Sequence, residues 1–203
     1  MNTFFCSDTH FGHSSIIHLC NRPWLRPGDM VDNGDYKVWA SPEIKEARTL
    51  EMDEAMIERW NAVVKAGDLV YHLGDFIYSK TATDETIRRL LGRLNGNIIL
   101  IKGNHDQLAW QNRSYFHGTY DTYKEIKVGE QLIVLNHYAQ RVWLKSHYGS
   151  FHLFGHSHGT LPDDPNSRSF DVGVDCHNYA PISFDQVKEI MSKKNFKPVD
   201  HHK

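Results

Sequence analysis

Fourteen histidines stand out in this sequence, and several of them lie close to acidic or amide residues. Each such group comes directly after a short apolar run, as Asp8 and His10 do after residues 3–6. Imidazole nitrogens combined with carboxylate and amide oxygens, without a thiolate, suit divalent ions such as Mn²⁺, Fe²⁺, Zn²⁺ or Ni²⁺. The candidate ligands that share this placement are Asp8, His10, Asp75, Asn104, His137, His156 and His158.

This ligand set is too large for one metal ion but suits two, provided that one carboxylate bridges them. Two ions about 3.5–4 Å apart can hold the attacking and leaving oxygens of an in-line displacement at phosphorus. The absence of cysteine from the set argues against a structural zinc site. The residue types therefore point to chemistry on a phosphate ester.

Short strands must position these side chains. Apolar runs too brief for helices predict strands at 3–6, 69–73, 97–101, 131–135, 151–154 and 170–174. In α/β sheets the carboxyl ends of the strands form one rim, so residues scattered along the chain can converge there. Glycines beside the candidate ligands, such as Gly74, Gly103 and Gly155, allow sharp turns as the chain leaves each strand.

Helical spacing of apolar residues predicts helices over about 52–64 and 87–94. Ser183, with Gln186 three residues later, is typical of a helix start. An alternating segment at 123–128, a turn at Gly129 and Glu130, and the next apolar run predict a β-hairpin. We therefore expect an α/β fold with parallel units first and antiparallel strands later.

The motifs, taken in order, resemble the calcineurin-like metallophosphoesterase superfamily. They stand here as Asp8-Thr9-His10, Gly74-Asp75, Gly103-Asn104-His105-Asp106, His137 and Gly155-His156-Ser157-His158. Residues 8–13 and 70–76 are similar to small, cap-less prokaryotic or phage-type members. The resemblance implies a four-layer sandwich of two mixed β-sheets flanked by helices.

The resemblance also implies roles for individual residues. Asp8, His10, Asp75 and His158 would hold one ion, and Asp75, Asn104, His137 and His156 the other. Asp75 would bridge two divalent ions, with Mn²⁺ preferred and Fe, Zn, Ni or Mg as alternatives, and a metal-bridging hydroxide would be the nucleophile. His105 would be the general acid, with Asp106 orienting it.

Bulk properties narrow the class of protein. The length of 203 residues predicts a single domain over 1–203, with an irregular insert at about 18–41. The net charge of -2 shows no global basic excess, which weakens a nucleic-acid substrate. No apolar stretch approaches the roughly 20 residues of a membrane helix. Three cysteines without CxxC spacing, and no leader-like N-terminus, predict a cytoplasmic protein.

Phosphodiesterase activity is favoured because the chain is short and has no cap domain. A phosphomonoesterase acting on a nucleotide or phosphoprotein is the alternative enzyme, and a nuclease would need a local basic patch around Arg22, Arg26 and Lys37. A non-catalytic metal-binding interaction module is disfavoured because the ligand set is complete. The substrate would be a phosphate ester, with a nucleotide or nucleic-acid end as candidates, and the oligomeric state is left open.

Further residues have competing interpretations. His13, Arg22 and Arg141 are candidates for substrate binding. Acidic residues with helical spacing, among them Asp53, are most simply solvated helix faces. Aromatic residues such as Tyr138 could stack on a nucleobase, although packing is the simpler interpretation for most of them.

Overall fold

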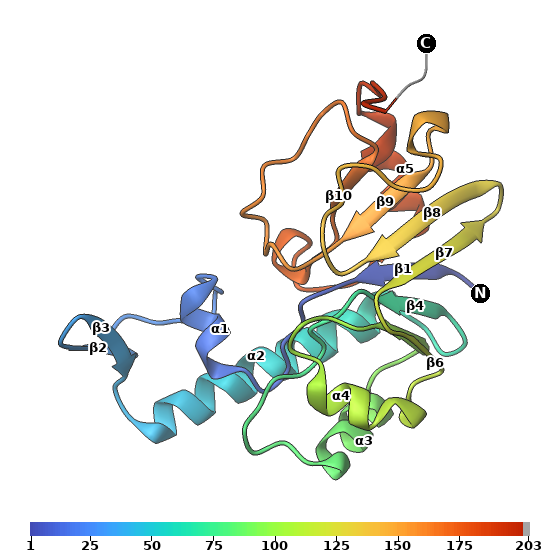
Figure 1. Cartoon of the computed structure of the whole chain (residues 1–203). Coiled ribbons are helices and arrows are strands. Elements are labelled where there is room, and N and C mark those ends of the chain that lie inside the picture. The colour runs from blue at the N-terminus through green and yellow to red at the C-terminus, as the bar shows by residue number, and fades with distance from the viewer. Residues whose placement is uncertain (201–203) are drawn as a thin grey trace.

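The computed structural model describes residues 1–200, whose strands form two mixed sheets and a separate hairpin (Figure 1). The larger sheet has the strand order β11-β1-β4-β5-β6. Its strands are β1 (Thr3–Cys6), β4 (Leu69–His72), β5 (Asn97–Ile101), β6 (Gly118–Tyr120) and β11 (Ile182–Ser183). The first four run parallel, and β11 pairs antiparallel with β1. The carboxyl ends of β1, β4 and β5 therefore lie side by side, as predicted.

The second sheet has the order β10-β9-β8-β7. Its strands are β7 (Tyr123–Val128), β8 (Gln131–Asn136), β9 (Phe151–Phe154) and β10 (Ser169–Asp171). The predicted hairpin is confirmed, because β7 and β8 pair antiparallel from Val128 opposite Gln131. The expectation that the later strands are mainly antiparallel was wrong, since β8, β9 and β10 pair parallel through long connections. This arrangement brings the carboxyl ends of β8 and β9 to one edge as well.

The helices are α1 (Ser14–Leu19), α2 (Pro42–Val63), α3 (Asp84–Arg93), α4 (Gln107–Gln111) and α5 (Phe184–Ser192). Short 3₁₀ turns occupy Arg113–Tyr115, Ser146–Tyr148 and Val174–Cys176. At the start of α5, the Ser183 hydroxyl accepts from the Gln186 amide while the Gln186 side chain accepts from the Ser183 amide, which confirms the predicted cap. Over residues 1–200, no helix combines the length and apolar character needed to cross a bilayer.

Helix α2 begins ten residues earlier than the apolar spacing predicted. Ser41 caps it by accepting the Ile44 amide at 3.2 Å, and Pro42 occupies the first helical position. The early turns are mostly exposed and polar, so they carry no apolar stripe to read from the sequence. From Met52 onward, the helix packs Met56 and Trp60 into the core.

Two apolar clusters lie on opposite faces of the larger sheet. Phe4 and Cys6 belong to the cluster that contains Trp60 of α2, and Phe5 belongs to the cluster that contains Leu135 of β8. Because successive side chains of a strand alternate between its faces, β1 is buried on both sides. Each large side chain fully buried there contributes roughly 1.5–3 kcal/mol to the stability of the fold. This packing holds the ends of the strands in place.

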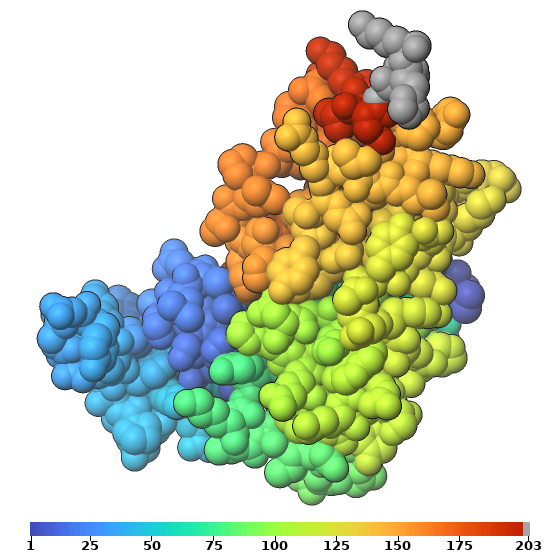
Figure 2. Space-filling view, viewed as in Figure 1, coloured from blue at the N-terminus to red at the C-terminus, as the bar shows by residue number. Residues whose placement is uncertain are grey.

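The insert at about 18–41, predicted to be irregular, contains regular structure. Strands β2 (Met30–Asn33) and β3 (Tyr36–Trp39) pair as a hairpin, which protrudes from the body of the molecule (Figures 1 and 2). Gly34 adopts a φ of 68° in the two-residue turn, a conformation that glycine adopts readily. The strands are too short and too exposed to give a clear alternating pattern.

Candidate metal centre

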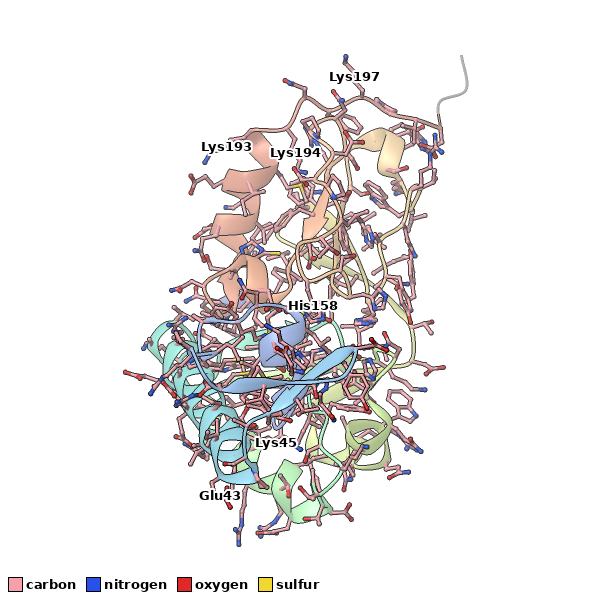
Figure 3. The ribbon with its side chains drawn as sticks, turned by 90° about the vertical axis from the view of Figure 1, so that its left-hand side faces the viewer. Glu43, Lys45, His158, Lys193, Lys194 and Lys197 are labelled. Carbon is pink, nitrogen blue, oxygen red and sulfur yellow. The ribbon has the colours of Figure 1, made fainter. Side chains whose placement is uncertain are left out.

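The structure brings the predicted ligands together as two adjacent groups. Asp8, His10 and His158 offer nitrogen and oxygen atoms within 4.8 Å of one another, and so do Asp75, His137 and His156. The first group joins the loop after β1 to the loop after β9, and the second joins the loops after β4, β8 and β9. In Figure 3, His158 lies at the middle of the molecule, where elements of the two sheets meet. Strand ends far apart in the sequence thus form one site.

Asp75 lies between the two groups. Its Oδ2 atom is 3.5 Å from His10 Nε2 and 3.6 Å from His137 Nε2. Its Oδ1 atom accepts the His105 amide at 2.8 Å, which fixes the orientation of the carboxylate. One oxygen therefore faces both groups at once.

Polar atoms in the first group are buried without partners. Asp8 and His10 are 0% and 2% exposed, yet Asp8 Oδ1 and His10 Nε2 have no hydrogen-bond partner among residues 1–200. The other Asp8 oxygen accepts the His156 amide at 2.9 Å. A buried, unpaired carboxylate oxygen is costly, and a cation would satisfy both orphaned atoms.

In the second group, lone pairs converge on one point. His137 Nδ1 donates to the Leu73 carbonyl at 2.8 Å, which leaves the Nε2 lone pair facing the other ligands. That Nε2 lies 2.9 Å from Asn104 Oδ1 and close to the Asp75 carboxylate. Oxygen and nitrogen acceptors arranged in this way fit a divalent ion.

The pKa values of the candidate ligands also indicate that a cation would stabilise the site. Burial raises the pKa of Asp8 to about 8, with the Asp75 carboxylate adding to the rise and His158 opposing it. Burial also lowers the pKa of His137 to about 4 and that of His10 far below its usual range. The neutral imidazoles of His10 and His137, beside a carboxylate that resists ionisation, form a site that a metal ion would stabilise.

The backbone is strained at the same positions. Five candidate ligands have φ in the left-handed region: Asp8 (60°), His10 (50°), Asp75 (57°), His156 (67°) and His158 (47°). Non-glycine residues rarely adopt this conformation, and strain of this kind clusters at functional sites. The fold thus maintains an unfavourable backbone in order to direct these side chains to one point.

Close approach of the ligand loops requires glycine at two positions. A Cβ atom on Gly74 would lie 2.5 Å from the Gly103 nitrogen, and one on Gly155 would overlap Asp8 and lie 2.5 Å from Ser7 Cβ. These glycines were predicted to allow sharp turns. The structure shows that they also allow the loops that carry the candidate ligands to pack against each other.

Arg22 was predicted to bind substrate, but it is buried behind the first ligand group and supports it. The residue is 1% exposed, and its guanidinium donates to both Asp175 oxygens at 2.9 Å. It also donates to the carbonyls of Asp8 at 2.7 Å and Thr9 at 3.0 Å. These contacts occupy the guanidinium, so the hypothesis that Arg22 contacts substrate does not fit its placement.

Asp175 was missed in the sequence, because it follows no ligand motif. It accepts from His158 Nδ1 at 2.8 Å, which directs the other ring nitrogen toward Asp8. Burial lowers the pKa of His158, but the hydrogen bonds to Asp175 and Cys20 outweigh burial and raise the pKa to about 10. Arg22 and Asp175 therefore position His158.

Asp106 is fully buried and supports the loops. It accepts the backbone amides of Asp75, Phe76 and Gly103 at 2.7–2.8 Å. No hydrogen bond joins its carboxylate to the His105 ring within residues 1–200. Its placement therefore favours support of the Asp75 loop over the expected orientation of His105.

His105 lies beside the first group in an aromatic cluster. Its ring centroid is 5.6 Å from that of His10 and 4.9 Å from that of Tyr78. Tyr78 in turn packs 4.4 Å from His13, whose Nδ1 lies 3.3 Å from His10 Nδ1. His13 therefore contacts a candidate ligand. Tyr78 was not selected from the sequence, because a single tyrosine in a loop carries no pattern.

Tyr138 flanks the second group. Its ring centroid is 4.6 Å from that of His156, its hydroxyl donates to Asn104 Oδ1 at 3.2 Å, and 49% of the residue is exposed. Arg141, three residues later, is exposed and lines a separate cavity of about 470 Å³. The ligands themselves do not line that cavity, so Arg141 lies beside the centre and not within it.

Asp53 differs from its predicted place on a solvated helix face. This half-buried residue of α2 accepts the Gly12 amide with both oxygens, at 3.0 and 3.1 Å. Burial raises its pKa to about 7 despite that hydrogen bond. Asp53 thus fixes the turn that follows His10.

Comparisons with known proteins agree with this geometry. The family model described as calcineurin-like phosphoesterase matches residues 1–169. The uncharacterized protein MJ1445 of Methanocaldococcus jannaschii is 31% identical over 195 residues, which cover 94% of this chain and 91% of the relative. The crystal structure of AQ665, a protein of unknown function from Aquifex aeolicus, has a TM-score of 0.65 at 24% identity, covering 93% of this chain and 98% of that one. The chain therefore belongs to the calcineurin-like phosphoesterase family, which confirms the resemblance predicted from its motifs.

Proposed function

We propose that this protein hydrolyses phosphodiesters at a dinuclear metal centre. The observation that carries the proposal is the placement of one Asp75 oxygen between two complete ligand groups, 3.5 and 3.6 Å from their histidines. A site for one ion would not require a carboxylate oxygen that faces two separate sets of histidines.

Each ion would have its own residues. Asp8, His10 and His158 would hold the first, Asn104, His137 and His156 the second, and Asp75 both. When bound, two divalent ions would neutralise the phosphoryl oxygens and activate water for attack. Mn²⁺ is the preferred candidate for both positions, because the set combines imidazole with oxygen ligands and no thiolate.

His105 is proposed to deliver the proton that the leaving oxygen needs. It is exposed, it follows the ligand Asn104 directly, and its amide is tied to Asp75, so the chain holds it at the edge of the centre. General acids of this kind contribute about 10²–10⁴-fold to turnover.

His13 is proposed to contact the substrate. Burial, and to a smaller extent the charge of nearby His105, lowers the pKa of His13 to about 4, so His13 is suited to accept a hydrogen bond from substrate.

A diester is favoured over a monoester because the centre is open. Asn104, His105 and His156 are exposed, and Tyr138 at its edge is half exposed. An open centre can admit a phosphate that carries substituents on two sides. A phosphomonoesterase and a non-catalytic metal-binding module remain the alternatives that the experiment below must separate.

The test compares bis-p-nitrophenyl phosphate with p-nitrophenyl phosphate, using protein stripped of metal and reloaded separately with Mn²⁺, Ni²⁺, Zn²⁺ or Mg²⁺. We expect metal-dependent turnover that favours the diester. Preference for the monoester would overturn the diesterase proposal. No turnover with any metal, although two ions are bound per chain, would support the binding module.

His105→Ala tests the proton donor separately. The variant should retain its metal, because the side chain is not a ligand, and should lose most turnover on esters with poor leaving groups. Equal loss across leaving groups, or loss of metal, would refute the role of His105.

A further inference from the structure

A second cavity lies beside the centre, on the side of the first ligand group. This groove, of about 760 Å³, runs between residues 12–15, the first turns of α2 and residues 78–81. His13 and Tyr78 line it, and their rings pack against each other at 4.4 Å. Since His13 Nδ1 also lies 3.3 Å from His10 Nδ1, one wall of the groove borders the first ligand group.

The side of the groove near the centre faces the proposed proton donor. Tyr78, Ser79 and Lys80 line both the groove and a neighbouring cavity of about 280 Å³ that includes His105. A leaving group protonated by His105 would therefore lie next to the 78–81 loop, which also forms one wall of the groove.

Basic side chains outnumber acidic ones in the lining of the groove. Lys45 and Lys80 line it, and neither forms an ion pair with any residue among 1–200, whereas Glu46 is the acidic residue in its lining. By contrast, Arg48 of α2 pairs with Asp29, and Arg93 pairs with Glu54 of α2. Figure 3 places Lys45 below His158 in that view.

The base of the groove is held in place. Asp53 accepts the Gly12 amide, and Gly12 lies against Ser79 so closely that a Cβ on it would be 3.1 Å from Ser79 Cβ. The turn after His10 and the 78–81 loop are thus packed together. This packing fixes the distance between the elements that carry Lys45 and Lys80.

We propose that this groove binds a second phosphate, so that the substrate is a phosphate ester whose leaving group itself carries a phosphate. Two lysines without carboxylate partners at the wall of a polar groove suit a multiply charged anion. The reaction remains hydrolysis: a water oxygen bonds to phosphorus, the ester P–O bond breaks, and the leaving oxygen gains a proton. The inference rests on the proposed function for its first phosphate only.

The test compares dithymidine phosphate with its 5′-phosphorylated and 3′-phosphorylated forms. One of the two forms places the extra phosphate on the leaving nucleoside, whichever ester bond is cleaved. The Mn²⁺-loaded protein should show about tenfold higher kcat/KM for that form, mainly through KM, and the preference should shrink with added salt. Lys45→Ala combined with Lys80→Ala should reduce the preference to about twofold or less. Lys127→Ala, an exposed lysine of β7 outside the groove, is the matched control and should retain it.

A binding measurement separates this inference from the proposed function. Calorimetric titration of Mn²⁺-loaded His105→Ala protein with the same three dinucleotides measures the preference without turnover. Hydrolysis of bis-p-nitrophenyl phosphate without any lysine-dependent preference would overturn the groove and leave the diesterase intact. Lysine-dependent binding without hydrolysis of any ester would support the groove and overturn the diesterase.

Discussion

Replacing Asp175 by asparagine should weaken one metal position and spare the other. The carboxylate accepts two hydrogen bonds from Arg22 at 2.9 Å and one from His158 at 2.8 Å. Asparagine keeps the shape but turns one acceptor into a donor that faces these donors. His158 and Arg22 then compete for one remaining oxygen, which weakens the contact that directs the second His158 nitrogen toward Asp8.

The expected losses of stability and of metal affinity follow from the burial of the Arg22–Asp175 pair and from its contact with His158. The side chains of Arg22 and Asp175 are 0% and 7% exposed, and leaving one partner of a buried pair uncompensated costs about 3–5 kcal/mol. Because asparagine retains one acceptor, we expect the metal-free protein to lose about 3 kcal/mol of unfolding free energy. Loss of a partner that orients a metal ligand lowers affinity by about 10–100-fold, here at the Asp8, His10 and His158 group alone.

The assay is Mn²⁺ titration with chelator competition, alongside urea unfolding of the metal-free protein. Asp185→Asn is the matched control, because that carboxylate is exposed and its ion pair is with Lys188 on the surface of α5. Weakening of both metal positions by the same factor, or unchanged affinity at both, would refute the role assigned to Asp175.

Three further predictions address the loops. Gly155→Ala would place a Cβ 2.5 Å from Ser7 Cβ, so thermal unfolding should show a loss of about 1–3 kcal/mol; unchanged stability would contradict the required contact. Asp106→Asn loses acceptor capacity for three buried amides and should lower the urea unfolding free energy by about 1–3 kcal/mol, whereas an unchanged midpoint would remove its supporting role. Burial raises the pKa of Asp53 to about 7, so the folded state holds an extra proton between about pH 4 and 7 and stability falls as pH rises through that range, by at most about 1.4 kcal/mol per pH unit. Asp53→Asn should remove this contribution while those of Asp8 and the buried histidines remain, and a slope identical to that of the native protein would contradict the raised pKa of Asp53.

The ligand loops could be predicted because each follows a buried strand. Residues 98–101, for example, are all apolar, and the polar residues after them have to emerge at the rim. The parallel pairing of β8 with β9 could not be predicted in the same way, because an apolar run does not show the direction of its partner.

The residues that support the centre were harder to find. Arg22 and Asp175 are 153 positions apart, and nothing in either neighbourhood indicates the other. Asp53 lies among the charged residues of a helix, and only the approach of Gly12 distinguishes it from them. Such partners depend on how the loops pack, which residue spacing along the chain does not encode.

The most direct test of the account is the number of metal ions per chain, measured by mass spectrometry of metal content on Mn²⁺-loaded protein and its Asp75→Asn variant, with diester hydrolysis followed on the same samples. The account predicts about two ions in the native protein, and a variant that loses both metal and turnover, because the shared oxygen between His10 and His137 carries its charge to both groups. A variant that keeps two ions and full turnover would contradict it.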